Sequence, residues 1–304
     1  PVRGPGPRES RLAAIADTLG RRARVAALIC DAHEDAALSL AALRTHNASG
    51  AVEAWRLPAA DHEARFKQYK ALAYAFRRAE ADPSVRWAVW ANDHTFLVAE
   101  NLACYLKTLS TTAPVYAGMR MWGPCCGLFN SGAAGFAVNR PALQLLTSRW
   151  RELAGTDDDE KCNPEKPKAH IATCLARLDR RAVPVDTRDH GAERFLTYGP
   201  VRLATGAVDN WLVKKKENMV PPEPFARDGS VVSSHVVSFH YVAAPEHRLL
   251  HSLLHGERPL LARDDAAEAL GARWPEGREQ LGGYAHPWPR KRPDNSAKVL
   301  ALLR

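Results

Sequence analysis

The sequence predicts an α/β fold, because short apolar runs alternate with segments of helical periodicity through the first half of the chain. Three of these runs have the length and the side chains of buried strands, at residues 24–30, 52–57 and 87–92. A segment with helical spacing follows each run, and the three segments end near Arg44, Glu80 and Leu109. Strands joined by helices in this way indicate a mainly parallel, twisted sheet flanked by helices, with right-handed crossovers.

The second half of the chain extends this pattern. We expect strands at 114–118 and 236–242 and helices at 141–150, 169–178 and 245–256. The aromatic stripe of the helix at 64–80 is expected to pack into the core rather than to bind a ligand. We predict one domain over residues 21–256, a flexible lead at 1–20 in which 10–19 have helical spacing, and a loosely attached extension at 257–304.

The charge and the motifs exclude several classes of protein. A net charge of +8 permits binding to nucleic acid, anionic membranes or phosphorylated ligands. However, most basic residues are scattered apart from short runs such as Lys214–Lys216, and no nucleic-acid-binding module accompanies them. No Gly-x-Gly-x-x-Gly follows the first predicted strand, and no P-loop pattern occurs. We therefore disfavour nucleic-acid binding, dinucleotide-dependent oxidation and P-loop NTP hydrolysis.

The cysteines favour an oxidising compartment. The sequence has 6 cysteines, an even number, without a Cys-x-x-Cys pair, so a zinc ribbon is unsupported. The sequon Asn47-Ala48-Ser49 favours the same compartment. No apolar run reaches the roughly 18 residues that a membrane span requires.

Polar side chains end the strand predicted at 87–92. Asn92, Asp93 and His94 follow its apolar residues directly. Ligands in open α/β sheets bind outside the carboxyl ends of the strands, so we expect a substrate or an ion here. The alternative is an Asx-type turn that caps the next helix through Asp93 or Thr95. Asp31, which ends the first predicted strand, is a further candidate for binding at this edge.

A segment of small residues joins Phe129 to Val138. Gly132, Ala133 and Gly135 within it allow backbone amides to approach a ligand closely. The same glycines are equally compatible with a tight bend between two strands.

The order of these motifs resembles that of the Fringe-like inverting glycosyltransferases. The motifs are the strand ending at Phe96 with Glu100-Asn101-Leu102 in the next helix, the strand 114–118, Asn130-Ser131-Gly132-Ala133-Ala134-Gly135-Phe136, a helix with Cys174, and Ser238-Phe239-His240-Tyr241-Val242. The chain is most similar to the core 1 β1,3-galactosyltransferase group, which shares the Ser-Phe-His-Tyr-Val ending. The resemblance covers residues 24 to 255.

This resemblance implies a GT-A fold, a UDP-sugar donor, a glycan or glycoprotein acceptor and usually Mn²⁺. It also implies a type II membrane protein of the Golgi or the ER lumen, with an anchor upstream of Pro1. By position, the acidic Asp-x-Asp triplet of the family falls on Asn92, Asp93 and His94, and its late metal-binding histidine falls on His240. Lys70 matches a family lysine that could face the donor.

The chain departs from the family pattern in its metal motif. Asn92 and His94 replace acidic residues, so the site loses negative charge and hard oxygen ligands. Imidazole still binds Mn²⁺ or a softer transition metal, so Asp93, His94 and His240 could hold an ion. The alternative is that both histidines are hydrogen-bonded residues and no metal binds.

The chain also departs from the family at the general base. Pro167 and Lys168 stand where the family has a Glu-Asp pair whose aspartate deprotonates the acceptor hydroxyl. A lysine with an ordinary pKa is protonated at neutral pH and cannot take that proton. A carboxylate of the acidic loop at 157–165, such as Asp158 or Glu165, would have to replace it.

Two functions follow from the resemblance and these departures. The first is an inverting glycosyltransferase that moves a hexose from a UDP donor to a glycan or glycoprotein hydroxyl. The resemblance to the core 1 group implies that the hexose is galactose and the new linkage β1,3. In this hypothesis Asp93, His94 and His240 hold the metal and the diphosphate, and Gly132 to Gly135 lies against the donor sugar. The second is a catalytically inactive relative that binds a partner enzyme or a glycan, which explains the lost acidic residues directly.

Overall fold

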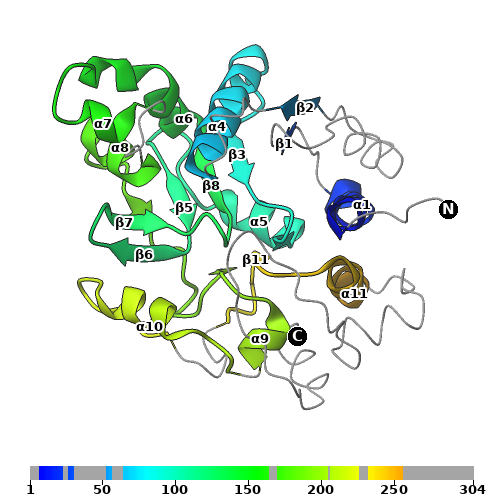
Figure 1. The fold of residues 1–304 in the computed structure, drawn as a ribbon. Coiled ribbons are helices and arrows are strands. Elements are labelled where there is room, and N and C mark those ends of the chain that lie inside the picture. Colours follow the sequence, from blue (N-terminus) through cyan, green and yellow to red (C-terminus); the bar gives the residue numbers. More distant parts are fainter. Residues whose placement is uncertain are drawn as a thin grey trace.

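The structure is a computed structural model, and it describes residues 7–22, 27–30, 53–56, 64–163, 170–204, 206–225 and 232–255. Helices and short strands alternate along these residues, so the predicted α/β class is confirmed (Figure 1). The extension predicted at 257–304 lies outside the described residues.

The largest sheet has four strands in the order β3-β8-β5-β9. Its strands are β3 (Trp87–Trp90), β8 (Phe136–Asn139), β5 (Tyr116–Gly118) and β9 (Pro184–Val185). β8 is antiparallel to both β3 and β5, whereas β5 and β9 are parallel. β8 is buried along its whole length, but Val89 in β3 is 40% exposed, so β3 is only half-buried and not the fully buried strand expected.

Three smaller sheets surround this one. β1 (Ala27–Cys30) and β2 (Glu53–Arg56) are parallel. β11 (Ser238–Phe239) lies between β10 (Phe195–Leu196), to which it is parallel, and β4 (Phe96–Leu97), to which it is antiparallel. β6 (Arg120–Gly123) and β7 (Gly127–Asn130) form a hairpin whose turn ends at Gly127, with φ +65°.

The prediction of a mainly parallel sheet is wrong for the described residues. Four strand pairings are antiparallel and three are parallel. After β5 the chain turns back through the β6–β7 hairpin, and β8 then runs between β3 and β5 in the opposite direction. No helix joins β7 to β8, so the alternation that predicted parallel strands breaks down at this point.

The helices agree closely with the predicted periodicity. Those predicted at 64–80, 97–109, 141–150, 169–178 and 245–256 appear as α4, α5, α6 with η2, α8 and α11. Within the described residues, none is long and apolar enough to cross a membrane. The bounds are α1 (Pro7–Asp17), α2 (Leu19–Arg22), α4 (Ala64–Ala81), α5 (Ala99–Leu106), α6 (Arg140–Thr147), the 3₁₀ helix η2 (Arg149–Leu153), α7 (Asp159–Cys162), α8 (Ile171–Leu178), α9 (Pro200–Ala204), α10 (Asn210–Glu217) and α11 (Ala244–His255).

Asn139 fixes the junction between β8 and α6. Its side-chain oxygen accepts hydrogen bonds from the backbone N–H of Ala142, at 3.1 Å, and of Val115, at 2.9 Å. The first bond caps α6, and Pro141 occupies the first turn, where a missing N–H costs nothing. The second bond ties the cap to the residue before β5, so one side chain holds the helix and the sheet together.

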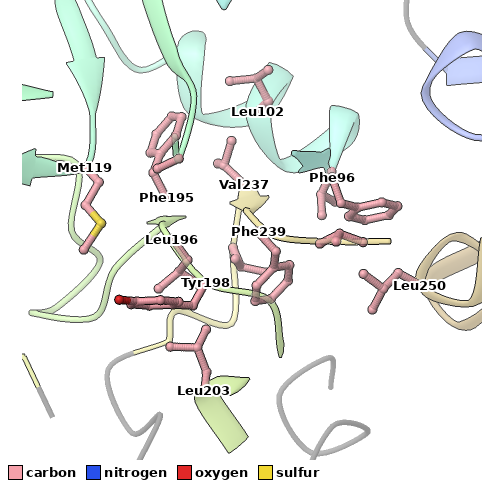
Figure 2. Close-up of a cluster of buried hydrophobic side chains, with 14 of the residues drawn as sticks. Phe96, Leu102, Met119, Phe195, Leu196, Tyr198, Leu203, Val237, Phe239 and Leu250 are labelled. Carbon is pink, nitrogen blue, oxygen red and sulfur yellow. The ribbon is translucent and has the colours of Figure 1, made fainter. Parts of the chain in front are cut away.

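Two clusters of buried apolar side chains form the core. One lies between the four-stranded sheet and helices α4, α6 and α8, and it contains Tyr69 and Leu72 of the predicted stripe on α4. The other surrounds the β10-β11-β4 sheet. In Figure 2, Phe96, Leu102, Phe239 and Leu250 converge there from β4, α5, β11 and α11. The prediction that the stripe of α4 is core is confirmed for these two residues.

The N-terminal helix α1 packs against α11 instead of forming a flexible lead (Figure 1). Leu12, Ala14 and Ala16 on α1 are buried. Arg248 of α11 donates a hydrogen bond to the carboxylate of Asp17 at 3.1 Å. Small alanines allow the two helices to approach closely, a contact that the spacing within 10–19 alone does not reveal.

We predict that Val138→Ala lowers the free energy of unfolding by about 2 kcal/mol, because it removes two buried methyl groups and leaves a cavity. Val89→Ala is the matched control, since Val89 pairs with the neighbouring residue of β8 but is 40% exposed. It makes the same chemical change and should cost less than about half as much. Urea denaturation of both variants tests this, and equal losses would contradict the assigned faces.

Candidate functional site

A polar turn follows β3 and is built by Asn92. The side-chain oxygen of Asn92 accepts the backbone N–H of His94 at 3.1 Å and the hydroxyl of Thr95 at 2.8 Å. Its backbone oxygen accepts the N–H of Thr95 at 3.0 Å. The turn predicted as an alternative is therefore present, but Asn92 makes it. The N-cap of α5 is Val98, so neither Asp93 nor Thr95 caps that helix.

Thr95 joins this turn to two distant segments. Its hydroxyl lies 3.0 Å from the backbone oxygen of Ala133 and 3.3 Å from Nδ1 of His240. The Trp90 indole N–H donates to the oxygen of Gly132 at 3.2 Å, and the Ser238 hydroxyl donates to the oxygen of Ala134 at 2.6 Å. The end of β3, the small-residue segment and the residues after β11 therefore meet at one place.

The two glycines of the small-residue segment differ in what surrounds them, and close packing against the backbone requires glycine at Gly135. Gly135 has φ +80°, and a Cβ there would lie 2.9 Å from the backbone oxygen of Trp90. At Gly132 a Cβ would lie 2.2 Å from Nε2 of Gln68, a side chain of α4. The tight bend predicted as one alternative is thus observed at Gly135. At Gly132 the neighbour is the end of a flexible side chain, which a ligand can displace.

Asp93 forms an ion pair with an arginine of the N-terminal helix. Nε of Arg11, on α1, donates to Oδ2 of Asp93 at 2.8 Å. Both side chains are largely buried, with 14% of Arg11 and 21% of Asp93 exposed. The other carboxylate oxygen of Asp93 lies 3.7 Å from Nε2 of His94. The acidic group at the end of β3 is therefore neutralised by a cation of the chain itself.

Two histidines at the site are neutral at physiological pH. Burial lowers the pKa of His240 to about 3, nearby His94 acts in the same direction, and Asp93 opposes it. Burial likewise lowers the pKa of His247, on α11, to about 3. Nε2 of His247 is buried without a hydrogen-bond partner in the described part of the chain, and its ring packs edge-on against Phe96 at 5.5 Å. A proton on either ring would be a buried charge.

The side chains proposed as Mn²⁺ ligands, Asp93, His94 and His240, lie near one another, and Asp93 is already paired with Arg11. Mn²⁺ prefers several carboxylate or carbonyl oxygens. The Asn92 oxygen is already engaged by two hydrogen bonds, and the Arg11 guanidinium beside Asp93 would repel a divalent ion. Among the described residues, no three His, Cys, Asp or Glu side chains converge as ligands. His94 and His240 are close, with ring centroids 6.1 Å apart, but imidazole is a borderline ligand.

The remaining candidate residues do not join this cluster in the described structure. Asp158 precedes α7, on the far side of the four-stranded sheet from α1 (Figure 1). Its carboxylate lies 3.2 Å from Nε of Arg177 and 3.8 Å from Nζ of Lys161. Asp31 and Glu165 lie outside the described residues. Lys70 lies in α4, two residues from Gln68, and its side chain is not described.

Sequence reasoning missed three side chains of the site. Thr95 appeared only as a helix cap, and Ser238 only as part of a family motif. Arg11 lay in a segment taken as a flexible lead. The helical spacing within 10–19 was the signal that this segment could pack, since Leu12 and Ala16, four residues apart, lie on one face of a helix and both are buried.

We predict that Thr95→Val lowers the free energy of unfolding by about 1–3 kcal/mol, because it leaves buried polar partners on three segments without the hydroxyl. Thr108→Val is the matched control, since the Thr108 hydroxyl makes an exposed bond to the oxygen of Tyr105. That change should cost less than about 1 kcal/mol. Thermal and urea unfolding measure both, and a neutral Thr95→Val would contradict the joining role.

We predict that acid destabilises the protein partly through His247. Its pKa is about 3 in the folded protein against 6.5 ordinarily, so below pH 6.5 the unfolded chain binds a proton that the folded chain does not. Stability therefore falls as the pH drops from 6.5 towards 3. His247→Leu should make this fall shallower by about 1.4 kcal/mol per pH unit.

The control for the acid experiment is Leu250→Ala, which empties a buried position on the same helix. It should lower stability equally at every pH, because leucine does not titrate. Urea unfolding of the three proteins from pH 7 to pH 4 gives the slopes. Parallel slopes for the parent and His247→Leu would contradict burial of a neutral imidazole.

Comparison of the sequence with protein-family models finds no match. What this chain does is therefore inferred from the geometry of its own residues and from the motifs that they form.

Proposed function

We propose that this chain is an inverting glycosyltransferase with a GT-A-like fold, which transfers a hexose from a UDP-sugar to a glycan or glycoprotein hydroxyl. We propose galactose as the transferred sugar and β1,3 as the linkage formed, because the chain resembles the core 1 group. The observation that carries the proposal is the meeting of three distant motifs around Thr95. These are the same three motifs that the resemblance assigns to donor binding.

The placement of the site favours a nucleotide-sugar donor. Asp93 and His94 follow the carboxyl end of β3, where α/β folds bind ligands. The small-residue segment carries Gly132, where a Cβ would meet the end of the flexible Gln68 side chain, and we propose that a sugar ring displaces this side chain. Both His94 and Asp93 keep 21% of their side-chain surface exposed, so a ligand can contact them although most of each side chain is buried.

The reaction requires a base and a group that stabilises the departing UDP. The acceptor oxygen attacks the anomeric carbon, the bond from that carbon to the UDP oxygen breaks, and the acceptor proton passes to the base. A carboxylate of the 157–165 loop is the proposed base, with Asp158 and Glu165 as candidates. Asp158 would have to separate from Arg177 and Lys161 to act. We propose the Golgi or ER lumen as the location, on the resemblance, the sequon and the even cysteine count.

The second candidate function is a non-catalytic relative that binds a nucleotide, a glycan or a partner enzyme. The specific observation in its favour is that Asp158, directly before α7, is ion-paired with Arg177 and Lys161. Such a protein would keep the donor site and lack transfer.

We predict that UDP and UDP-galactose bind the purified chain. His94→Ala should weaken UDP binding roughly tenfold by removing a side chain at the mouth of the site. His235→Ala is the matched control, since His235 is an exposed histidine paired with Asp189 at 2.9 Å. Titration calorimetry measures the affinity of UDP for the parent, for His94→Ala and for His235→Ala. Equal loss in both variants, or no binding of UDP by the parent, would contradict the proposed donor site.

Release of UDP from UDP-galactose in the presence of a peptide carrying N-acetylgalactosamine separates the two functions. Transfer that disappears in Asp158→Asn, with UDP affinity unchanged, identifies Asp158 as the base. UDP binding without transfer to this or other glycan acceptors favours the non-catalytic relative.

A further inference from the structure

We propose that Arg11 supplies the positive charge that binds the donor diphosphate, so that this chain binds its nucleotide without a divalent ion. The inference rests on the proposed UDP-sugar site and changes what holds the phosphates there. The geometry that points to it is the ion pair between Arg11 and Asp93, at the position where the resemblance expects a metal.

The first step is the chemistry of the altered triplet. Asn92 and His94 stand where acidic residues are expected, and Asp93 is the one carboxylate left among the three. That carboxylate is bound by a guanidinium at 2.8 Å. A divalent ion in the same place would face a fixed positive charge instead of two further negative ones, which opposes its binding.

The second step is the capacity of Arg11 to bind a phosphate. Within the described residues, its one hydrogen bond runs from Nε to Asp93. A guanidinium has five N–H donors, so the four on the two Nη atoms can still donate to phosphate oxygens. Bonds between a guanidinium and a phosphate are short and often bidentate. Arg11 is 14% exposed, so it can reach a ligand while most of the side chain stays packed.

The third step is that α1 holds Arg11 in place before any ligand arrives. Leu12, Ala14 and Ala16 are buried, and Arg248 of α11 pairs with Asp17 at the end of the same helix. As the bond to the sugar breaks, negative charge develops on the departing diphosphate. A positive charge already fixed nearby stabilises this leaving group without any movement of the protein, which is the role that a metal ion usually fills. Asp93 then acts as a positioning residue that orients the guanidinium.

The test is titration calorimetry of UDP against the whole chain, in a chelator and again with Mn²⁺. We expect binding in the chelator with an affinity that Mn²⁺ changes less than about threefold. Arg11→Gln should weaken UDP binding about 10- to 100-fold, because charged hydrogen bonds are lost. Arg11→Lys, which keeps a point charge but not the planar donors, should lie in between.

Arg248→Gln is the matched control, because it removes an ion pair between α11 and α1 and leaves the pair between Arg11 and Asp93 in place. It should bind UDP as the parent does. A loss of affinity in Arg248→Gln equal to that in Arg11→Gln would overturn the proposal, since the effect would then come from loosening α1.

If Arg11→Gln does not fold, the parent and Arg11→Lys still test whether Arg11 replaces the metal ion. UDP binding that appears only with Mn²⁺ and persists in Arg11→Lys overturns the role of Arg11 but leaves the donor site in place. No UDP binding by any protein, with or without Mn²⁺, contradicts the proposed function itself and this inference with it.

Discussion

The turn that follows β3 is the constraint on which the site depends. Thr95 has one hydroxyl proton, yet its oxygen lies within hydrogen-bond distance of Asn92, Ala133 and His240. The proton can serve one acceptor at a time, so the hydroxyl must also accept, which an Nδ1–H of His240 allows. Because Thr95 and His240 are buried and the other two groups are partly buried, any path of the chain that left them apart would cost free energy. The small-residue segment and the residues after β11 are therefore held at the end of β3.

This junction lies between the two apolar clusters and links them. Phe136, directly after the small-residue segment, belongs to the cluster on the α4 side, and Phe239, directly before His240, belongs to the cluster around β11. Gly135 allows the chain to pass close to the oxygen of Trp90 between them. The polar site is thus fixed by packing on both sides, which gives its side chains defined positions without a bound ligand.

Local sequence patterns predicted most of the helices and strands but not how they are arranged in space. The stripe at Tyr69 and Leu72 predicted α4 and its buried face, and Pro141 predicted the start of α6, because both depend on neighbours in the sequence. The direction of β8 depends on how β6 and β7 fold back, which periodicity does not record. In the site, Asn92, Gly135 and His240 could be found as polar or glycine positions at strand ends. Arg11 could not, because its partner Asp93 is 82 residues away and only the packing of α1 on α11 brings them together.

The charge at the site shows why an arginine can take the place of an ion. The carboxylates of an acidic triplet repel a diphosphate, and a bound divalent ion is what makes such a site receptive to it. Here Asp93 and Arg11 sum to zero, and His240 and His247 are neutral because burial lowers the pKa of each to about 3. The loss of acidic residues at 92 and 94 therefore does not leave an unbalanced site. It removes carboxylates that a divalent ion would otherwise neutralise, and under our proposal the remaining N–H donors of Arg11, rather than an ion, bind the donor phosphates.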